Sequence, residues 1–190
     1  MYLDLGFEHI IDIGSYDHIL FVITLCGIYI LKQWKNVLIL VTAFTIGHSI
    51  TLVLATLNLI YISNYIVELL ISVTIFVTSV FNIIHKGTDY SKILHRIKYF
   101  TALFFGLIHG LGFASSLRSM LGMEDSLILP LFGFNLGLEI GQLVIVFTIL
   151  LIAFVFINFL KVSRREWNLV ISGAGAGISL ILIMERINMF

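Results

Sequence analysis

The chain has 190 residues, of which 59% are hydrophobic and 12% charged, and its formal net charge at pH 7 is zero. Soluble domains carry about 45–50% apolar and roughly 25% charged residues, so this chain has too few charges to cover a surface exposed to water. The composition excludes a soluble enzyme, a nucleic-acid binder and a disordered protein. A single cysteine, Cys26, leaves no partner for an internal disulfide and no cysteine-rich metal cluster. The sequence therefore predicts an all-α integral membrane protein.

The first 14 residues contain acidic side chains and a histidine but no strongly basic side chain. They include Asp4, Glu8, His9 and Asp12 but neither lysine nor arginine. A secretory signal peptide begins with a positively charged region, and this segment has none. We expect it to be an outward-facing, partly amphipathic segment that leads into the first membrane span.

Six long apolar runs come after this segment, and a spanning helix needs about 20 mostly apolar residues. The runs are continuous and do not alternate as barrel strands do, so we expect helices. Pro130 is suited to the first turn of a helix and marks the start of the fifth run. The sequence predicts a single transmembrane domain over residues 1–190, a six-helix transmembrane bundle with spans at about 15–31, 37–60, 64–85, 99–120, 129–159 and 168–185.

The basic residues indicate the orientation of these spans. Nine of the eleven lysines and arginines fall in the segments after the first, third and fifth spans, and only Arg118 and Arg186 fall on the other side. Because cytoplasmic loops carry the excess of positive charge, we expect both termini outside, in a multi-pass protein of the bacterial inner (plasma) membrane.

Ionisable residues inside the spans are few, and each costs at least about 2.5–3.5 kcal/mol at the centre of a bilayer. Their spacing places them on helix faces. His48 shares a face with Thr45 and Ser49, and glycines at 106 and 110 flank His109. In the fifth span, the polar side chains at i, i+4 and i+7 project from one side: Asn135, Glu139 and Gln142.

These faces suggest one shared site between the middle of the membrane and its outer face. The candidate metal ligands are Asp17, His18, His48, His109 and Glu139, with His9 closing the site from above. Nitrogen and oxygen ligands of this kind suit Zn, Ni, Co or Fe, whereas Mg and Ca prefer oxygen alone. Ser49, Asn135 and Gln142 are candidates to hold the ligands by hydrogen bonds. The alternative is structural: each histidine only hydrogen-bonds a neighbouring helix, and Asp17 caps the first span.

Five segments of the chain resemble the HupE/UreJ family of hydrogenase and urease accessory membrane proteins. They are EHI at 8–10, GSYDHILF at 14–21, FTIGHSITL at 44–52, GLIHGLGFA at 106–114 and FNLGLEIGQL at 134–143. The resemblance implies an inner-membrane protein of six to seven helices that acts as a nickel or cobalt permease. It implies ion-handling roles for His9, Asp17, His18, His48, His109 and Glu139.

The chain departs from the nickel-permease pattern at two places. Seven residues separate His9 from Asp17, where nickel permeases of the family have five between the matching positions. Those permeases also carry a second histidine shortly after the one that matches His109, and here the segment continues Gly-Leu-Gly-Phe-Ala. The chain therefore resembles a sister branch, whose ion need not be nickel.

Two functions fit these residues. The first is a permease or metal-handling accessory protein for a divalent transition metal such as Ni, Co or Zn. The second is an intramembrane zinc-type hydrolase acting on a lipid or membrane peptide, with Glu139 as general base. The cytoplasmic halves of the spans look poor in polar side chains, which leaves an ion without an obvious exit. The resemblance favours transport; the expected partners are a metal ion and the lipid bilayer, no nucleic acid, and the oligomeric state stays open.

Overall fold

The computed structural model describes residues 1–12, 14, 16–85, 92–121 and 127–188, apart from the side chains of 92–94, 115, 116, 120 and 121. The described residues form helices and connecting turns and contain no strand. The α-helices are α1 (Tyr2–Ile11), α2 (Tyr16–Cys26), α3 (Trp34–Thr56), α4 (Asn64–Ile84), α5 (Lys92–Leu121), α6 (Ile128–Asn158) and α7 (Arg164–Asn188), and a short 3-10 helix, Leu31–Gln33, precedes α3.

Five segments are long and apolar enough to cross a membrane by themselves. They are Leu31–Thr56, Asn64–Ile84, His95–Ala114, Ile128–Asn158 and Arg164–Asn188. Helices α1 and α2 meet the same criterion only as a pair, bent by 70°. The chain is therefore a multi-pass membrane protein with five spans, or with six if the bent pair crosses as one.

The first span differs from the sequence prediction. A continuous helix was expected over 15–31, but α2 ends at Cys26 and, at 1.5 Å per residue, is about 17 Å long. That is roughly half the hydrocarbon thickness of a bilayer. The segment before it forms the helix α1, which packs against α6 with Gly6 and Ile10 buried. The prediction was wrong because the apolar run continues past the turn at Gly27, so hydropathy alone does not show where the helix stops.

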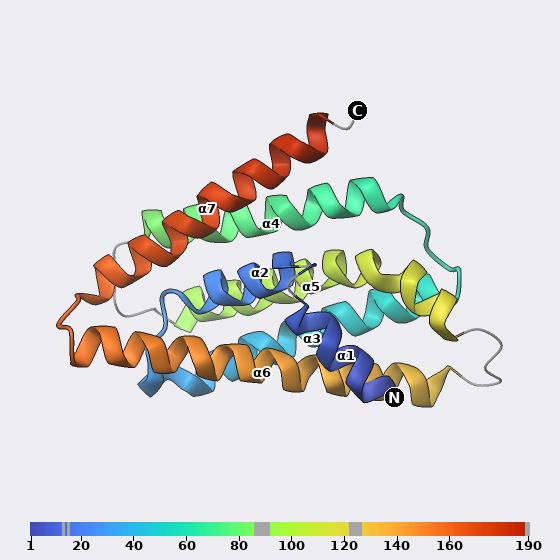
Figure 1. The fold of residues 1–190 in the computed structure, drawn as a ribbon, viewed down its shortest axis with the longest axis horizontal. Helices are drawn as coiled ribbons and strands as arrows, with labels where there is room; N and C mark the ends of the chain where they lie inside the picture. The colour runs from blue at the N-terminus through green and yellow to red at the C-terminus, as the bar shows by residue number, and fades with distance from the viewer. Residues whose placement is uncertain (13, 15, 86–91, 122–126, 189–190) are drawn as a thin grey trace.

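The remaining helices run back and forth along the long axis of the molecule. In Figure 1, α3, α5 and α7 run in one direction and α4 and α6 in the other. The C-terminal ends of α2, α4 and α6 therefore lie at one end of the bundle, and the C-terminal end of α3 lies at the other. This alternation is the one expected from the distribution of basic residues.

Helices α3 and α5 approach each other so closely that their backbones are in contact. A Cβ atom added to Gly106 would lie 2.1 Å from the carbonyl oxygen of Phe44, and one added to Gly110 would lie 2.2 Å from that of His48. From the other side, a Cβ on Gly47 would lie 2.1 Å from the carbonyl oxygen of Leu103. Only glycine permits this distance, and the three glycines fix the two histidine-bearing helices against each other.

Helix α1 is held on α6 in the same way. A Cβ added to Gly6 would lie 1.9 Å from the carbonyl oxygen of Phe134, and one added to Gly137 would lie 1.9 Å from that of Leu3. Figure 1 shows α1 lying across the N-terminal half of α6. The glycines of α6 therefore allow α1 to pack closely against it, which places α1 beside the other helices of the bundle.

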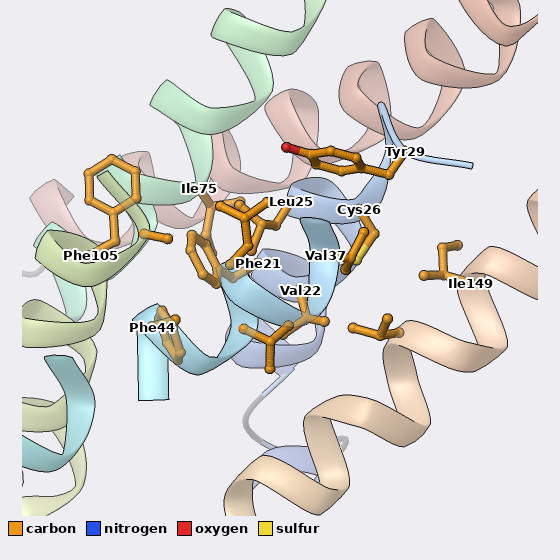
Figure 2. Close-up of a cluster of buried hydrophobic side chains, with 14 of the residues drawn as sticks. Phe21, Val22, Leu25, Cys26, Tyr29, Val37, Phe44, Ile75, Phe105 and Ile149 are labelled. Atoms are coloured by element: carbon orange, nitrogen blue, oxygen red, sulfur yellow. The ribbon is translucent and has the colours of Figure 1, made fainter. Parts of the chain in front are cut away.

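The main hydrophobic core surrounds α2. Phe21 is fully buried, and Val22, Leu25 and Cys26 are buried beside it. Figure 2 shows the other members of this core gathering around α2 from α3, α4, α5 and α6, among them Phe44, Ile75, Phe105 and Ile149. The short helix is thus enclosed by the long ones, which fixes the side chains at its N-terminal end.

Candidate metal centre

Three histidines from three different helices meet inside the bundle. His9 of α1, His18 of α2 and His48 of α3 each offer a ring nitrogen, and these three atoms lie within 4.8 Å of one another. His48 is 0% exposed and His18 is 5% exposed, while His9 is half-buried. The three side chains, which we call the histidine cluster, come from three helices and are assembled by the helix packing described above.

Asp17 orients His18. Its Oδ1 lies 2.9 Å from Nδ1 of His18 and accepts the backbone N–H of His18 at 2.8 Å. Because an ionised carboxylate can only accept, Nδ1 of His18 carries the hydrogen of this contact, and in a neutral ring the lone pair is then on Nε2. That Nε2 is buried and has no hydrogen-bond partner among the described residues. Asp17 therefore holds the ring of His18 in position, and its own carboxylate is not part of the converging group.

The other two members of the histidine cluster also have ring nitrogens without partners. Nε2 of His9 and both nitrogens of His48 are buried and have no partner in hydrogen-bond geometry among the described residues, although the amide of Asn135 lies close enough to His48 to interact with it. A buried polar atom left in this state costs about 1–3 kcal/mol. Three such imidazoles turned toward one point are what a metal ion would satisfy, since neutral imidazole is a ligand for Zn, Cu, Fe and Ni. The donor set fits a transition metal.

His109 of α5 lies beside the histidine cluster but is not one of the three converging histidines. Its ring centroid is 5.1 Å from that of His18, and the side chain is 0% exposed. Its Nε2 lies 3.0 Å from Oγ1 of Thr74 on α4, and its Nδ1 has no partner among the described residues. Thr74 was not among the predicted site residues, because a single threonine in an apolar span gives no signal before its neighbours are known.

The polar face of α6 contacts α3 at a different place. Thr42 donates to Glu139 at 2.9 Å, Thr45 donates to Gln142 at 2.9 Å, and Ser49 donates to Asn135 at 2.6 Å. The prediction that these α6 residues share one side of a helix is confirmed. The side faces a shallow groove between α3 and α6 of about 340 Å³, lined by Glu139, Asn135, Ser49 and Thr42.

Glu139 is therefore not brought to the histidine cluster. The group of residues able to hold an ion consists of histidines alone among the described residues. The hydrolase hypothesis gave Glu139 the role of general base at a zinc-bound water, and this arrangement does not support it. Gln142 is fully buried, and its Nε2 has no partner among the described residues.

Aromatic rings enclose the histidine cluster. The ring of Phe113 lies 3.9 Å from that of His9, and Phe134 lies 5.8 Å from His9 and 6.5 Å from His48. Phe21 and Phe44 lie 4.8 Å and 5.1 Å from His109. This apolar shell keeps water and competing hydrogen-bond partners away from the imidazole nitrogens.

A cavity on the far side of Asp17 connects it to the outside of the bundle. Its volume is about 330 Å³, and its lining includes Asp17, Glu68, Glu185 and Arg186. Glu68 pairs with Arg186 at 2.8 Å. Asp17 thus lines this acidic cavity and also contacts His18 of the histidine cluster.

A second set of buried polar side chains lies between α2, α4 and α7, and we call it the polar seam. Asn82 donates to the carbonyl oxygen of Thr24 at 2.8 Å, Asn168 donates to that of Asn82 at 2.8 Å, and Ser172 donates to Oδ1 of Asn168 at 2.8 Å. The seam lies in the half of the bundle where polar side chains were not expected. That expectation was wrong because it treated each serine, threonine and asparagine as isolated, whereas helix packing gathers them.

Comparison with known proteins identifies the family of the chain. No curated protein and no solved structure matches the chain. A sequence profile of the family described as HupE / UreJ protein matches residues 1–186, and this range includes every member of the histidine cluster. The chain therefore belongs to the HupE/UreJ family, which is linked to nickel or cobalt uptake or to accessory roles.

Proposed function

We propose that this protein is a permease, or a metal-handling accessory protein, for a divalent transition-metal ion of the nickel or cobalt type. The ion would bind between His9, His18 and His48. The observation that carries the proposal is the convergence of three ring nitrogens within 4.8 Å, on rings that each have a buried nitrogen without a hydrogen-bond partner among the described residues. Sites at the interface of helices inside the membrane are where secondary transporters bind their substrates.

The cluster offers an ion three neutral ligands and no direct carboxylate. Three neutral imidazoles leave both positive charges of the ion uncompensated, and a charge in a low-dielectric interior is costly. The carboxylate nearest to the ligands is that of Asp17, which acts through His18. A cargo site must bind strongly enough to be entered and weakly enough to be left, so reversible binding is what distinguishes it from a resident site.

The acidic cavity provides access to the site. A cation is attracted to the carboxylates of Asp17, Glu68 and Glu185, which line this cavity. With both termini outside the bacterial inner membrane, as the basic residues favour, the direction of transport is inward.

Uptake into proteoliposomes tests the proposal. Vesicles containing the purified full chain and a trapped metal-sensitive dye are exposed to Co²⁺, Ni²⁺ or Mg²⁺. Saturable uptake of Co²⁺ or Ni²⁺ but not of Mg²⁺ is expected, and His48→Leu is expected to abolish it. Uptake no faster than in protein-free vesicles would contradict the permease proposal, and equal uptake by wild type and variant would contradict the assignment of the site.

A further inference from the structure

Thr74 makes two contacts through one hydroxyl group. Its Oγ1 lies 2.7 Å from the carbonyl oxygen of Ile71, one turn earlier in α4, and 3.0 Å from Nε2 of His109. The side chain is 3% exposed, so water does not compete for either contact. Among the described residues, the Thr74 hydroxyl is the one hydrogen-bond partner of the His109 ring: it contacts Nε2, and Nδ1 has no partner.

The number of hydrogens decides which nitrogen of His109 carries the proton. A threonine hydroxyl has one hydrogen to donate, and the carbonyl oxygen of Ile71 can only accept it. The hydroxyl then acts as acceptor toward His109, so the donor must be Nε2–H. In this tautomer Nδ1 is a lone pair, and it is buried without a partner among the described residues. The opposite tautomer would bury an unpaired N–H donor, at a cost of about 1–3 kcal/mol.

His18 shows the same arrangement with the nitrogens exchanged. Asp17 accepts from Nδ1 of His18, which leaves the lone pair on Nε2. The rings of His18 and His109 are 5.1 Å apart and nearly perpendicular, with an interplanar angle of 84°. Each of the two neighbouring imidazoles thus has one nitrogen held by a protein group and the other available as a ligand.

We propose that Thr74 is a positioning residue that fixes His109 in the tautomer presenting Nδ1 as a fourth imidazole ligand. The ion is the one bound by His9, His18 and His48, so the inference rests on the function proposed above. His109 joins that group when ion binding draws the side chains together. The ion would then have four imidazole ligands and neither a thiolate nor a carboxylate in direct contact.

Titration of the purified full chain with Co²⁺ tests this role. Cobalt is a suitable probe because its visible absorption is strong in a four-coordinate site and weak in a six-coordinate one. Thr74→Val keeps the shape of the side chain and removes the hydroxyl, and loss of an outer partner of a metal ligand weakens binding by about 10–100-fold. We expect that loss, together with weaker visible absorption, and we expect Thr74→Ser to restore both.

Thr78→Val is the matched control. Thr78 lies one turn further along α4, and its hydroxyl donates to the carbonyl oxygen of Thr74 at 2.8 Å. The same chemical change there should leave Co²⁺ affinity and spectrum as in wild type. An equal loss in Thr78→Val and Thr74→Val would contradict the positioning role and indicate a general effect on α4.

Two further outcomes separate the inference from the function on which it rests. Absence of Co²⁺ binding by wild type would overturn both. Wild-type binding with an unchanged affinity and spectrum in Thr74→Val would overturn the role of Thr74 alone. Nitrogen NMR of histidine-labelled wild type without metal requires no folded variant at position 74: a protonated Nε2 and bare Nδ1 of His109 are expected, and a protonated Nδ1 would contradict the inference.

Discussion

The histidine cluster and the polar seam both contain buried polar side chains, but they differ in whether the polar atoms of these side chains are hydrogen-bonded. In the polar seam, the side-chain amides of Asn82 and Asn168 donate to carbonyl oxygens at 2.8 Å. In the histidine cluster, ring nitrogens of His9, His18 and His48 are left without partners among the described residues. Buried polar groups are normally hydrogen-bonded, and an exception needs an explanation.

The difference separates two functions of intramembrane polarity. Side chains whose hydrogen bonds are complete tie helices together, and their removal costs stability. Side chains whose nitrogens converge without partners cost stability themselves and are available to a ligand. Replacing a polar side chain by leucine should therefore reduce metal binding but not stability in the histidine cluster, and stability but not metal binding in the polar seam.

The largest effect is expected from His48→Leu. Loss of one of three converging ligands should weaken Co²⁺ or Ni²⁺ binding by more than about 100-fold, since it removes a direct ligand and not merely an outer partner. Thermal unfolding of the metal-free protein in detergent should be unchanged or shifted upward, because two buried nitrogens without partners disappear. A marked loss of stability would mean that His48 is structural.

The glycine contact between α3 and α5 gives the next largest effect. A Cβ on Gly110 would lie 2.2 Å from the carbonyl oxygen of His48, whereas a Cβ on Gly173 of α7 would meet nothing within 4 Å. Gly110→Ala should lower the free energy of unfolding by about 1–3 kcal/mol through overpacking and should weaken metal binding by displacing His48. Gly173→Ala is the control and should leave both unchanged or stabilise the helix slightly. Similar behaviour of the two variants would contradict the close approach.

Asn168→Leu makes the corresponding change in the polar seam. It removes the hydrogen bonds with Asn82 and Ser172 and should lower the free energy of unfolding by about 1–3 kcal/mol. Co²⁺ affinity should stay near that of wild type, because none of these side chains belongs to the histidine cluster. The pattern is the reverse of that expected for His48→Leu, and a loss of binding without loss of stability would break the distinction.

The smallest effect is expected at the rim of the acidic cavity. Glu68 and Arg186 form an ion pair at 2.8 Å, with side chains 41% and 31% exposed. Pairs this exposed contribute about 0–1 kcal/mol, so Glu68→Gln should hardly change thermal unfolding. It should slow Co²⁺ uptake at low ionic strength, and the difference should shrink as salt screens the cavity. An effect independent of salt would contradict the electrostatic role of the cavity.

Hydropathy and spacing predict the long helices well, because apolar runs of about 20 residues leave few alternatives. The spans expected at 64–85 and 129–159 agree with α4 (Asn64–Ile84) and α6 (Ile128–Asn158) to within a residue at each end. Helix α1 was missed as part of the bundle because ten residues with two acidic side chains do not resemble a span. Its place depends on the glycines of α6, and a contact between two helices cannot be inferred from either alone.

The residues of the site could be predicted individually, but the contacts between them could not. The histidines could be selected from sequence because ionisable residues are rare in spans, and the glycines beside His109 correctly indicated a close neighbour. Glu139 was assigned to the same site because it also lies on a polar face. Periodicity identifies such a face but not the helix that it meets, and Glu139 meets Thr42. Thr74 became visible only once α4 was placed beside α5.

Equilibrium dialysis of the purified full chain against Ni²⁺ and Co²⁺ tests the proposed site most directly, with His48→Leu and Asn168→Leu measured beside wild type. Wild type and Asn168→Leu are expected to bind one ion per chain reversibly, and His48→Leu is expected to bind none in the same concentration range. Absence of binding by wild type, or equal binding by His48→Leu, would contradict a metal site built on the three histidines.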